Sequence, residues 1–190
     1  MKKIQLIWSL RMRLFHWFLA LAILTAWLSG DDEWLDIHTL AGYAVGALLL
    51  ARLYLGLAGR GHERFKAAYG PGIRMFQNPL AAARETSLDA TGHPPASAVT
   101  LGALLILLIG VAISGVAALG AMEMEGPLAG ALMGLDKHQA RALKELHEIF
   151  ANLSLLLIGA HIAGVLIDHF IHKTGVIRGM ITGYKETKDD

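Results

Sequence analysis

The sequence predicts an all-α membrane protein, a bundle of four transmembrane helices. Of its 190 residues, 54% are hydrophobic and only 17% are charged, whereas soluble domains carry about 25% charged residues. The mean hydropathy is +0.47. Four apolar segments have lengths compatible with spanning helices, at roughly 14–29, 36–57, 97–119 and 145–170. We expect residues 1–190 to form a single integral membrane domain.

The first apolar segment is short, and tryptophans at both of its ends are suited to anchor it at the membrane interfaces. It ends at Trp27-Leu28-Ser29-Gly30 and lacks the small-residue cleavage site of a signal peptide, so we expect a retained span. The acidic turn GDDEWLD leads into the second segment. Before the fourth segment, Asp136 is suited to cap a helix that runs directly into the span.

The placement of lysine and arginine predicts the orientation of the chain. Basic residues precede the first segment, follow the second and follow the fourth, while the first turn on the opposite side has none. The positive-inside rule then puts both termini in the cytoplasm. An even number of spans agrees with that orientation.

The chain contains no cysteine. Disulfides, thiolate-ligated iron–sulfur clusters, CxxCH haem attachment and a cysteine nucleophile are therefore excluded. Any metal or cofactor must be held by nitrogen, oxygen or thioether ligands.

Two histidines in the fourth segment, His147 and His161, give the strongest functional signal. They are fourteen residues apart, which on a helix is a rise of ~21 Å and a return to within ~40° of the same direction. One helix face thus carries two imidazoles at two depths of the membrane. Imidazole is costly in hydrocarbon and usually marks a functional site there.

Two further histidines match these depths. In the predicted orientation His16 starts the first span near the inner surface, as does His161, while His38 starts the second span near the outer surface, as does His147. Any one of the four could simply be hydrogen-bonded to its neighbours. Four ligands at two matched depths favour two metal centres, with His16 and His161 at the inner one and His38 and His147 at the outer one.

Each predicted centre offers two imidazoles and almost no carboxylate. Zinc and di-iron sites in helical bundles use three or four clustered ligands. Two axial histidines suit a haem, because the porphyrin supplies the other four nitrogens. Small residues that could make room for a flat ring follow the histidines, notably Gly42, Gly46 and Gly164, although glycines also serve ordinary packing between membrane helices.

Several cations are candidates for haem propionates or a quinone. Arg52 lies fourteen residues after His38, at the level of the inner pair, where it could bind propionates or a quinone headgroup or could extend to the interface. His169 is a second candidate for a quinone site. Arg13, Arg141 and Lys144 lie near histidines and are further candidates for propionate contacts.

The chain resembles the bacterial cytochrome b561 family and its relatives, the cytochrome b subunits of nickel–iron hydrogenases and formate dehydrogenases. The resemblance rests on RLFHW, IHTLAGY, RLYLGLAGRGHERF, ELHE, IGAHIAG and HKTGVIRGMITG. It implies two haem b groups ligated by His16, His38, His147 and His161 in a bacterial inner-membrane protein. It also implies electron transfer between a respiratory quinone and a redox partner, such as a soluble cytochrome or a dehydrogenase or hydrogenase subunit.

We therefore expect a di-haem cytochrome b that contacts lipid, quinone and a redox protein, with a second copy of the chain as a further candidate partner and no nucleic acid. One alternative is an enzyme that oxidises superoxide at the outer haem and reduces quinone, which the acidic first turn disfavours. Others are a metal-ion transporter with a histidine-lined path and a haemless anchor for a peripheral enzyme.

Overall fold

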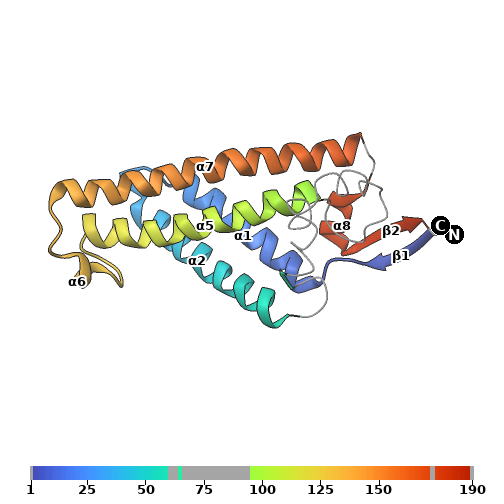
Figure 1. Cartoon of the computed structure of the whole chain (residues 1–190), viewed down its shortest axis with the longest axis horizontal. Coiled ribbons are helices and arrows are strands. Elements are labelled where there is room, and N and C mark those ends of the chain that lie inside the picture. Colours follow the sequence, from blue (N-terminus) through green and yellow to red (C-terminus); the bar gives the residue numbers. More distant parts are fainter. Residues whose placement is uncertain (1, 60–63, 66–94, 172–173, 189–190) are drawn as a thin grey trace. The chain divides into compact units, whose positions relative to one another are not determined.

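The computed structural model describes residues 2–59, 64–65, 95–171 and 174–188. Within these residues, four helices are long and apolar enough to cross a membrane. They lie in α1 (Leu10–Leu28), α2 (Leu35–Ala58), α5 (Pro95–Met122) and α7 (Lys137–Phe170) (Figure 1). The expected class, an all-α membrane protein, is confirmed.

Large apolar side chains point outward from these helices. Leu50, Ile106 and Leu156 are 68%, 71% and 69% exposed, and α1 has no buried residue at all. Such a continuous apolar surface would be unfavourable in water and is typical of helices that face lipid.

Two helices begin earlier than the hydropathy pattern suggests, and a capping side chain explains each start. Ser9 Oγ accepts a hydrogen bond from the Met12 amide at 3.3 Å, so α1 begins at Leu10. The Asp136 carboxylate accepts from the Gln139 amide at 2.8 Å, and the Gln139 side chain accepts from the Asp136 amide at 3.1 Å. This reciprocal capping box starts α7 before the apolar segment, which confirms the expected cap at Asp136.

Short helical turns join the long helices. The acidic turn between α1 and α2 contains the 3-10 helix η1 (Asp32–Trp34), and α6 (Ala129–Leu132) lies between α5 and α7. These connections are compact, which brings the end of α1 close to the start of α2 and the end of α5 close to the start of α7.

The two ends of the chain form a small sheet that the sequence did not predict. β1 (Lys2–Leu6) pairs antiparallel with β2 (Tyr184–Lys188), with Lys2 opposite Lys188 and Leu6 opposite Tyr184 (Figure 1). The helix α8 (Val176–Thr182) precedes β2 and ends at Gly183, whose φ of 90° favours glycine. The Gly183 carbonyl accepts hydrogen bonds from the amides of Ile7 and Trp8 at 2.9 and 3.2 Å.

The fold divides into two compact units. The terminal unit comprises Met1–Ala20, Leu50–Gly102 and Gly159–Asp190, and the central unit comprises Leu21–Leu49 and Ala103–Ile158. The terminal unit contains the sheet and α8, while the central unit contains η1 and α6. Each of the long helices contributes one part to each unit. That the whole chain acts as one membrane domain stays a prediction.

Candidate functional site

The central unit brings His38 and His147 together, as their predicted depths require. Their ring centres are 6.0 Å apart, and their planes are 89° to one another. Two imidazoles on opposite faces of one metal ion, each bound at ~2.0 Å, would have ring centres about 6 Å apart. His38 and His147 are thus near enough to one another that both would be able to hold the same metal ion or haem.

Both histidines of this pair have their Nδ1 atom next to a backbone carbonyl. His38 Nδ1 lies 2.8 Å from the Ala26 carbonyl oxygen, at the end of α1. His147 Nδ1 lies 3.1 Å from the Val111 carbonyl oxygen, within α5. Because a carbonyl only accepts, Nδ1 must carry the proton and donate it in each case. The lone pair of each ring is then on Nε2, the atom free to bind a metal.

Glycines shape the space around this pair in two different ways. A Cβ built on Gly42 or Gly46, one and two turns after His38, would meet no heavy atom within 4 Å. The space that a flat ring needs is thus open beside α2. In contrast, a Cβ on Gly115 of α5 would lie 3.0 Å from Cε1 and 3.2 Å from Nδ1 of His147. Gly115 therefore lets the His147 ring lie directly against α5.

The terminal unit contains the other two histidines, His16 of α1 and His161 of α7. The two side chains are near enough to interact electrostatically. His16 Nδ1 is buried and has no hydrogen-bond partner among the residues that the structure describes. An imidazole nitrogen buried in this way is expected to gain a partner when a ligand is bound.

The start of α1 is fastened to α8. The Arg13 guanidinium donates a hydrogen bond to the Ile181 carbonyl, and the Trp17 indole N–H donates to the Met180 carbonyl at 3.4 Å. These carbonyls lie in the last turn of α8, where helix carbonyls lack intrahelical partners. Arg13 thus holds the backbone near His16 in place. Its predicted propionate contact stays a prediction.

Arg52 is buried, with only 5% of its surface exposed. Its guanidinium carbon lies 4.7 Å from the centre of the Phe65 ring, a cation–π contact. A Cβ on Gly56, one turn after Arg52, would come within 2.2 Å of the same ring. Gly56 therefore makes the space in which Phe65 covers Arg52. Both interpretations of Arg52, a propionate or quinone contact and an arginine that extends to the interface, stay predictions.

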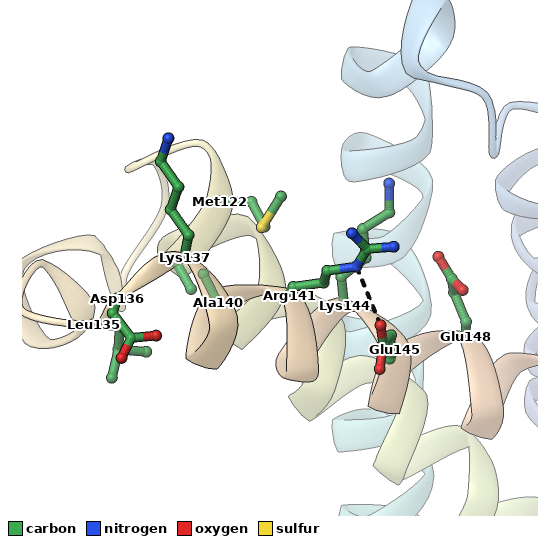
Figure 2. A pocket seen from close by; sticks show the side chains of 10 residues that line it. Met122, Leu135, Asp136, Lys137, Ala140, Arg141, Lys144, Glu145 and Glu148 are labelled. Atoms are coloured by element: carbon green, nitrogen blue, oxygen red, sulfur yellow. Dashed lines mark hydrogen bonds and ion pairs between the residues drawn. The ribbon is translucent and has the colours of Figure 1, made fainter.

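Arg141 and Lys144 lie on an open cavity of about 610 Å³ at the start of α7 (Figure 2). Arg141 Nε is 3.2 Å from Glu145 Oε1, and Lys144 Nζ is 3.9 Å from Asp32 Oδ1. The cavity is lined by both cations and carboxylates, with Met122 beside them. Binding of propionates by Arg141 and Lys144 stays a prediction.

His169 packs edge-on against Phe170, with ring centres 4.9 Å apart. Its Nδ1 is buried, again without a hydrogen-bond partner in the described parts of the chain. These parts contain no group of three or more histidine, cysteine or acidic side chains that could hold a metal ion. The two candidate pairs of imidazoles fit haem, whose porphyrin supplies the other four nitrogens.

Comparison with protein families returns a match that covers nearly the whole chain. The family model described as prokaryotic cytochrome b561 matches residues 7–183, which include all four spanning helices and all four histidines. The chain belongs to the prokaryotic cytochrome b561 family. No curated protein and no solved structure matches it.

Membership of the cytochrome b561 family makes this chain a multi-pass membrane protein that transfers electrons across the membrane with haem. The residues fit that cofactor, since the Nδ1 contacts of His38 and His147 leave the Nε2 lone pair of each ring available to bind an iron. The resemblance stated from sequence motifs is thus confirmed at the level of the family.

Sequence reasoning missed the parts of the site that α5 supplies. It assigned no functional residue to the third span, yet Val111, Ser114 and Gly115 all lie against His147. It also missed Ser154, which is 3% exposed and lies on α7 midway between His147 and His161. A spacing of seven residues through Ala140, His147, Ser154 and His161 was the available signal, because it marks one helix face.

Proposed function

We propose that this cytochrome holds two b haems, one between His38 and His147 and the other between His16 and His161. The 6.0 Å spacing of the His38 and His147 rings is the observation that carries the proposal. The occurrence of His16 and His161 in one compact unit supports the second pair. The unbroken helix α7 supplies one ligand to each centre.

His38 and His147 would hold one haem and His16 and His161 the other, and each haem would supply one-electron redox chemistry. The residues of the chain set the geometry of each centre. The Ala26 and Val111 carbonyls orient the rings of His38 and His147, and Gly42 and Gly46 leave room beside α2. These features suit electron transfer, which is fast when ligands do not rearrange.

We further propose that a respiratory quinone exchanges electrons on the cytoplasmic side of a bacterial inner membrane, and that both termini lie on that side. The placement of lysine and arginine supports the orientation. Buried Arg52 and the buried Nδ1 of His169, which has no hydrogen-bond partner among the described residues, are both in the terminal unit and are suited to a quinone carbonyl. A redox protein would dock at the opposite surface, where Met124 and Met133 are exposed.

A visible spectrum tests the haem assignment. The purified protein reduced with dithionite should show b-type α-bands, and a pyridine haemochrome assay should give two haems per chain. His38→Ala and His147→Ala should lose one and the same haem, and His16→Ala and His161→Ala the other. His138→Ala, which changes an exposed histidine of the same helix α7, is the matched control and should keep both haems.

Three results would contradict the proposal. A colourless protein that binds zinc or copper would support a metal-ion transporter, and one haem per chain would remove one of the two centres. Retention of both haems in His147→Ala or His161→Ala would show that the ligands lie elsewhere.

The quinone proposal is tested by the oxidation of the reduced protein with decylubiquinone. Arg52→Gln should raise the apparent KM about tenfold or more, because a hydrogen bond to a charged group is lost, while Arg52→Lys should retain part of the affinity. Arg141→Gln serves as the control at a distant charge. An unchanged KM in Arg52→Gln with both haems present would exclude Arg52 from the quinone site.

A further inference from the structure

Two serines occupy the same position relative to the carbonyls that accept the histidine protons. Ser29 follows Ala26 by three residues, and Ser114 follows Val111 by three residues. Ser29 Oγ lies 2.8 Å from the Thr25 carbonyl and 3.4 Å from the Ala26 carbonyl. Ser114 Oγ lies 2.7 Å from the Gly110 carbonyl and 3.2 Å from the Val111 carbonyl.

Both serines are buried, at 6% and 5% exposure, in helices that are otherwise rich in outward-facing apolar residues. A serine that bonds back to its own helix satisfies its hydroxyl, and this use is common in membrane helices. Such back-bonding does not explain why each serine lies three residues after a carbonyl that contacts a histidine. In each case the serine stands beside the one carbonyl that receives an imidazole proton from another helix.

Ser114 also contacts its histidine directly, with 3.3 Å between Oγ and His147 Nδ1. A hydroxyl has one hydrogen, and the shortest contact of Ser114 commits that hydrogen to the Gly110 carbonyl. The lone pairs of Oγ therefore face the histidine. The Nδ1–H of His147 is shared between two acceptors, the Val111 carbonyl and Ser114 Oγ.

We propose that Ser114 is a positioning residue for the iron ligand His147. Ser114 adds a second acceptor to Nδ1–H, fixes the tautomer that leaves Nε2 unprotonated, and limits rotation of the ring. Gly115 contributes to this positioning, because a Cβ built there would lie 3.0 Å from Cε1 of the His147 ring. The proposal rests on the proposed function, in which His147 binds a haem iron.

The hydrogen bonds at Nδ1 of His147 should affect the reduction potential of the iron that this histidine would bind. Acceptors at Nδ1–H increase the electron density that the imidazole donates from Nε2, and this favours ferric over ferrous iron. Removing the hydroxyl of Ser114 should therefore raise the reduction potential of the centre that His147 ligates. The centre of His16 and His161 should not change.

A redox titration of purified variants, followed by visible and electron paramagnetic resonance spectra, tests this. In Ser114→Ala the ratio of ferrous to ferric haem at a fixed potential should rise by up to about tenfold, equivalent to about +59 mV for one electron. Ser114→Thr should stay near the native value, and Ser114→Val, which matches threonine in shape, should shift like alanine. Ser29→Ala should not raise the potential in this way, because the Ser29 hydroxyl donates to the carbonyl that His38 contacts and is not itself the acceptor of the histidine proton.

Thr25→Val is the matched control, since the Thr25 hydroxyl bonds the Leu21 carbonyl of its own helix at 2.9 Å. It removes the same kind of bond without changing an acceptor of a histidine proton. The affected centre is assigned as the one whose signal is missing from His38→Ala and His147→Ala.

The outcomes separate this inference from the proposed function. If the native protein bound no haem, both the proposed function and the proposed role of Ser114 would be wrong. A native protein with two haems, in which Ser114→Ala, Ser114→Val and Ser114→Thr all keep the native potential and line shape, would overturn the role of Ser114 alone. Equal shifts in Ser114→Thr and Ser114→Val would also overturn it, because the added methyl group and not the hydroxyl would then be responsible.

Discussion

The two units of the molecule each contain two of the candidate ligand histidines, and they support them by different means. In the central unit, hydrogen bonds reach the histidines themselves, because carbonyls of α1 and α5 accept the Nδ1 protons of His38 and His147. In the terminal unit, His16 has no such partner within the described residues, and the support lies around it, where Arg13 and Trp17 bind the last turn of α8. Sensitivity to mutation should therefore be found beside the histidines in one unit and at the chain ends in the other.

The largest contrast should come from shortening the chain. A stop after Thr174 removes α8 and β2, and with them the carbonyls that bind Arg13 and Trp17. The haem of His16 and His161 should be lost and the other retained, as measured by haemochrome assay and optical spectrum. A stop after Gly183 keeps α8 and should preserve most of this haem. Equal loss of both haems would show that the two units do not depend on separate supports.

Gly115→Ala should produce the opposite contrast. Its Cβ would lie 3.0 Å from the His147 ring, so the ligand must shift, and changes next to a metal ligand typically weaken metal binding 10–100-fold. Transfer of haem to apomyoglobin should accelerate for the centre of His38 and His147 only. Gly130→Ala, where an added Cβ meets nothing within 4 Å, is the control. If haem left Gly115→Ala at the native rate, the contact between the His147 ring and Gly115 would not be important for holding the haem.

Phe65→Leu should destabilise the terminal unit without displacing a haem ligand. The ring covers Arg52 at 4.7 Å, and a buried cation–π contact is worth ~2 kcal/mol. The midpoint of thermal unfolding in detergent should fall, while Phe65→Tyr, which keeps an aromatic face, should remain near the native value. If Phe65→Leu and Phe65→Tyr unfold at the same temperature, the ring contributes packing and not cation–π stabilisation.

Arg141→Gln should have the smallest effect. Its ion pair with Glu145 is exposed, at 77% and 61% for the two side chains, and such pairs contribute about 0.5 kcal/mol or less. We expect native haem content and an almost unchanged unfolding midpoint. A clear loss of the haem of His38 and His147 would instead identify Arg141 as a propionate contact.

Much of the fold, and the approach of His38 to His147, could be predicted because both depend on periodicity and hydropathy. Four spans follow from apolar length, and the fourteen-residue spacing on α7 puts His147 and His161 on one face. The depth of each histidine then selects its partner. His38 and His147 meet in the structure as that reasoning requires.

The remaining features depend on contacts that no local pattern encodes. β1 and β2 are five residues each and lie at opposite ends of the sequence, and strands this short are not stable alone. The Val111 carbonyl is a backbone atom, so no residue type identifies it as the acceptor for His147. Serine in a membrane helix usually satisfies itself, so Ser114 does not stand out until its neighbour on α7 is known.

The pairing of β1 with β2 also orders the events of biosynthesis. All the residues of the central unit have been translated once synthesis passes Ile158. The terminal unit contains β1 and β2, with Lys2 opposite Lys188, so its sheet cannot form until β2 has been synthesised. The central unit is therefore fully translated before the two strands can pair.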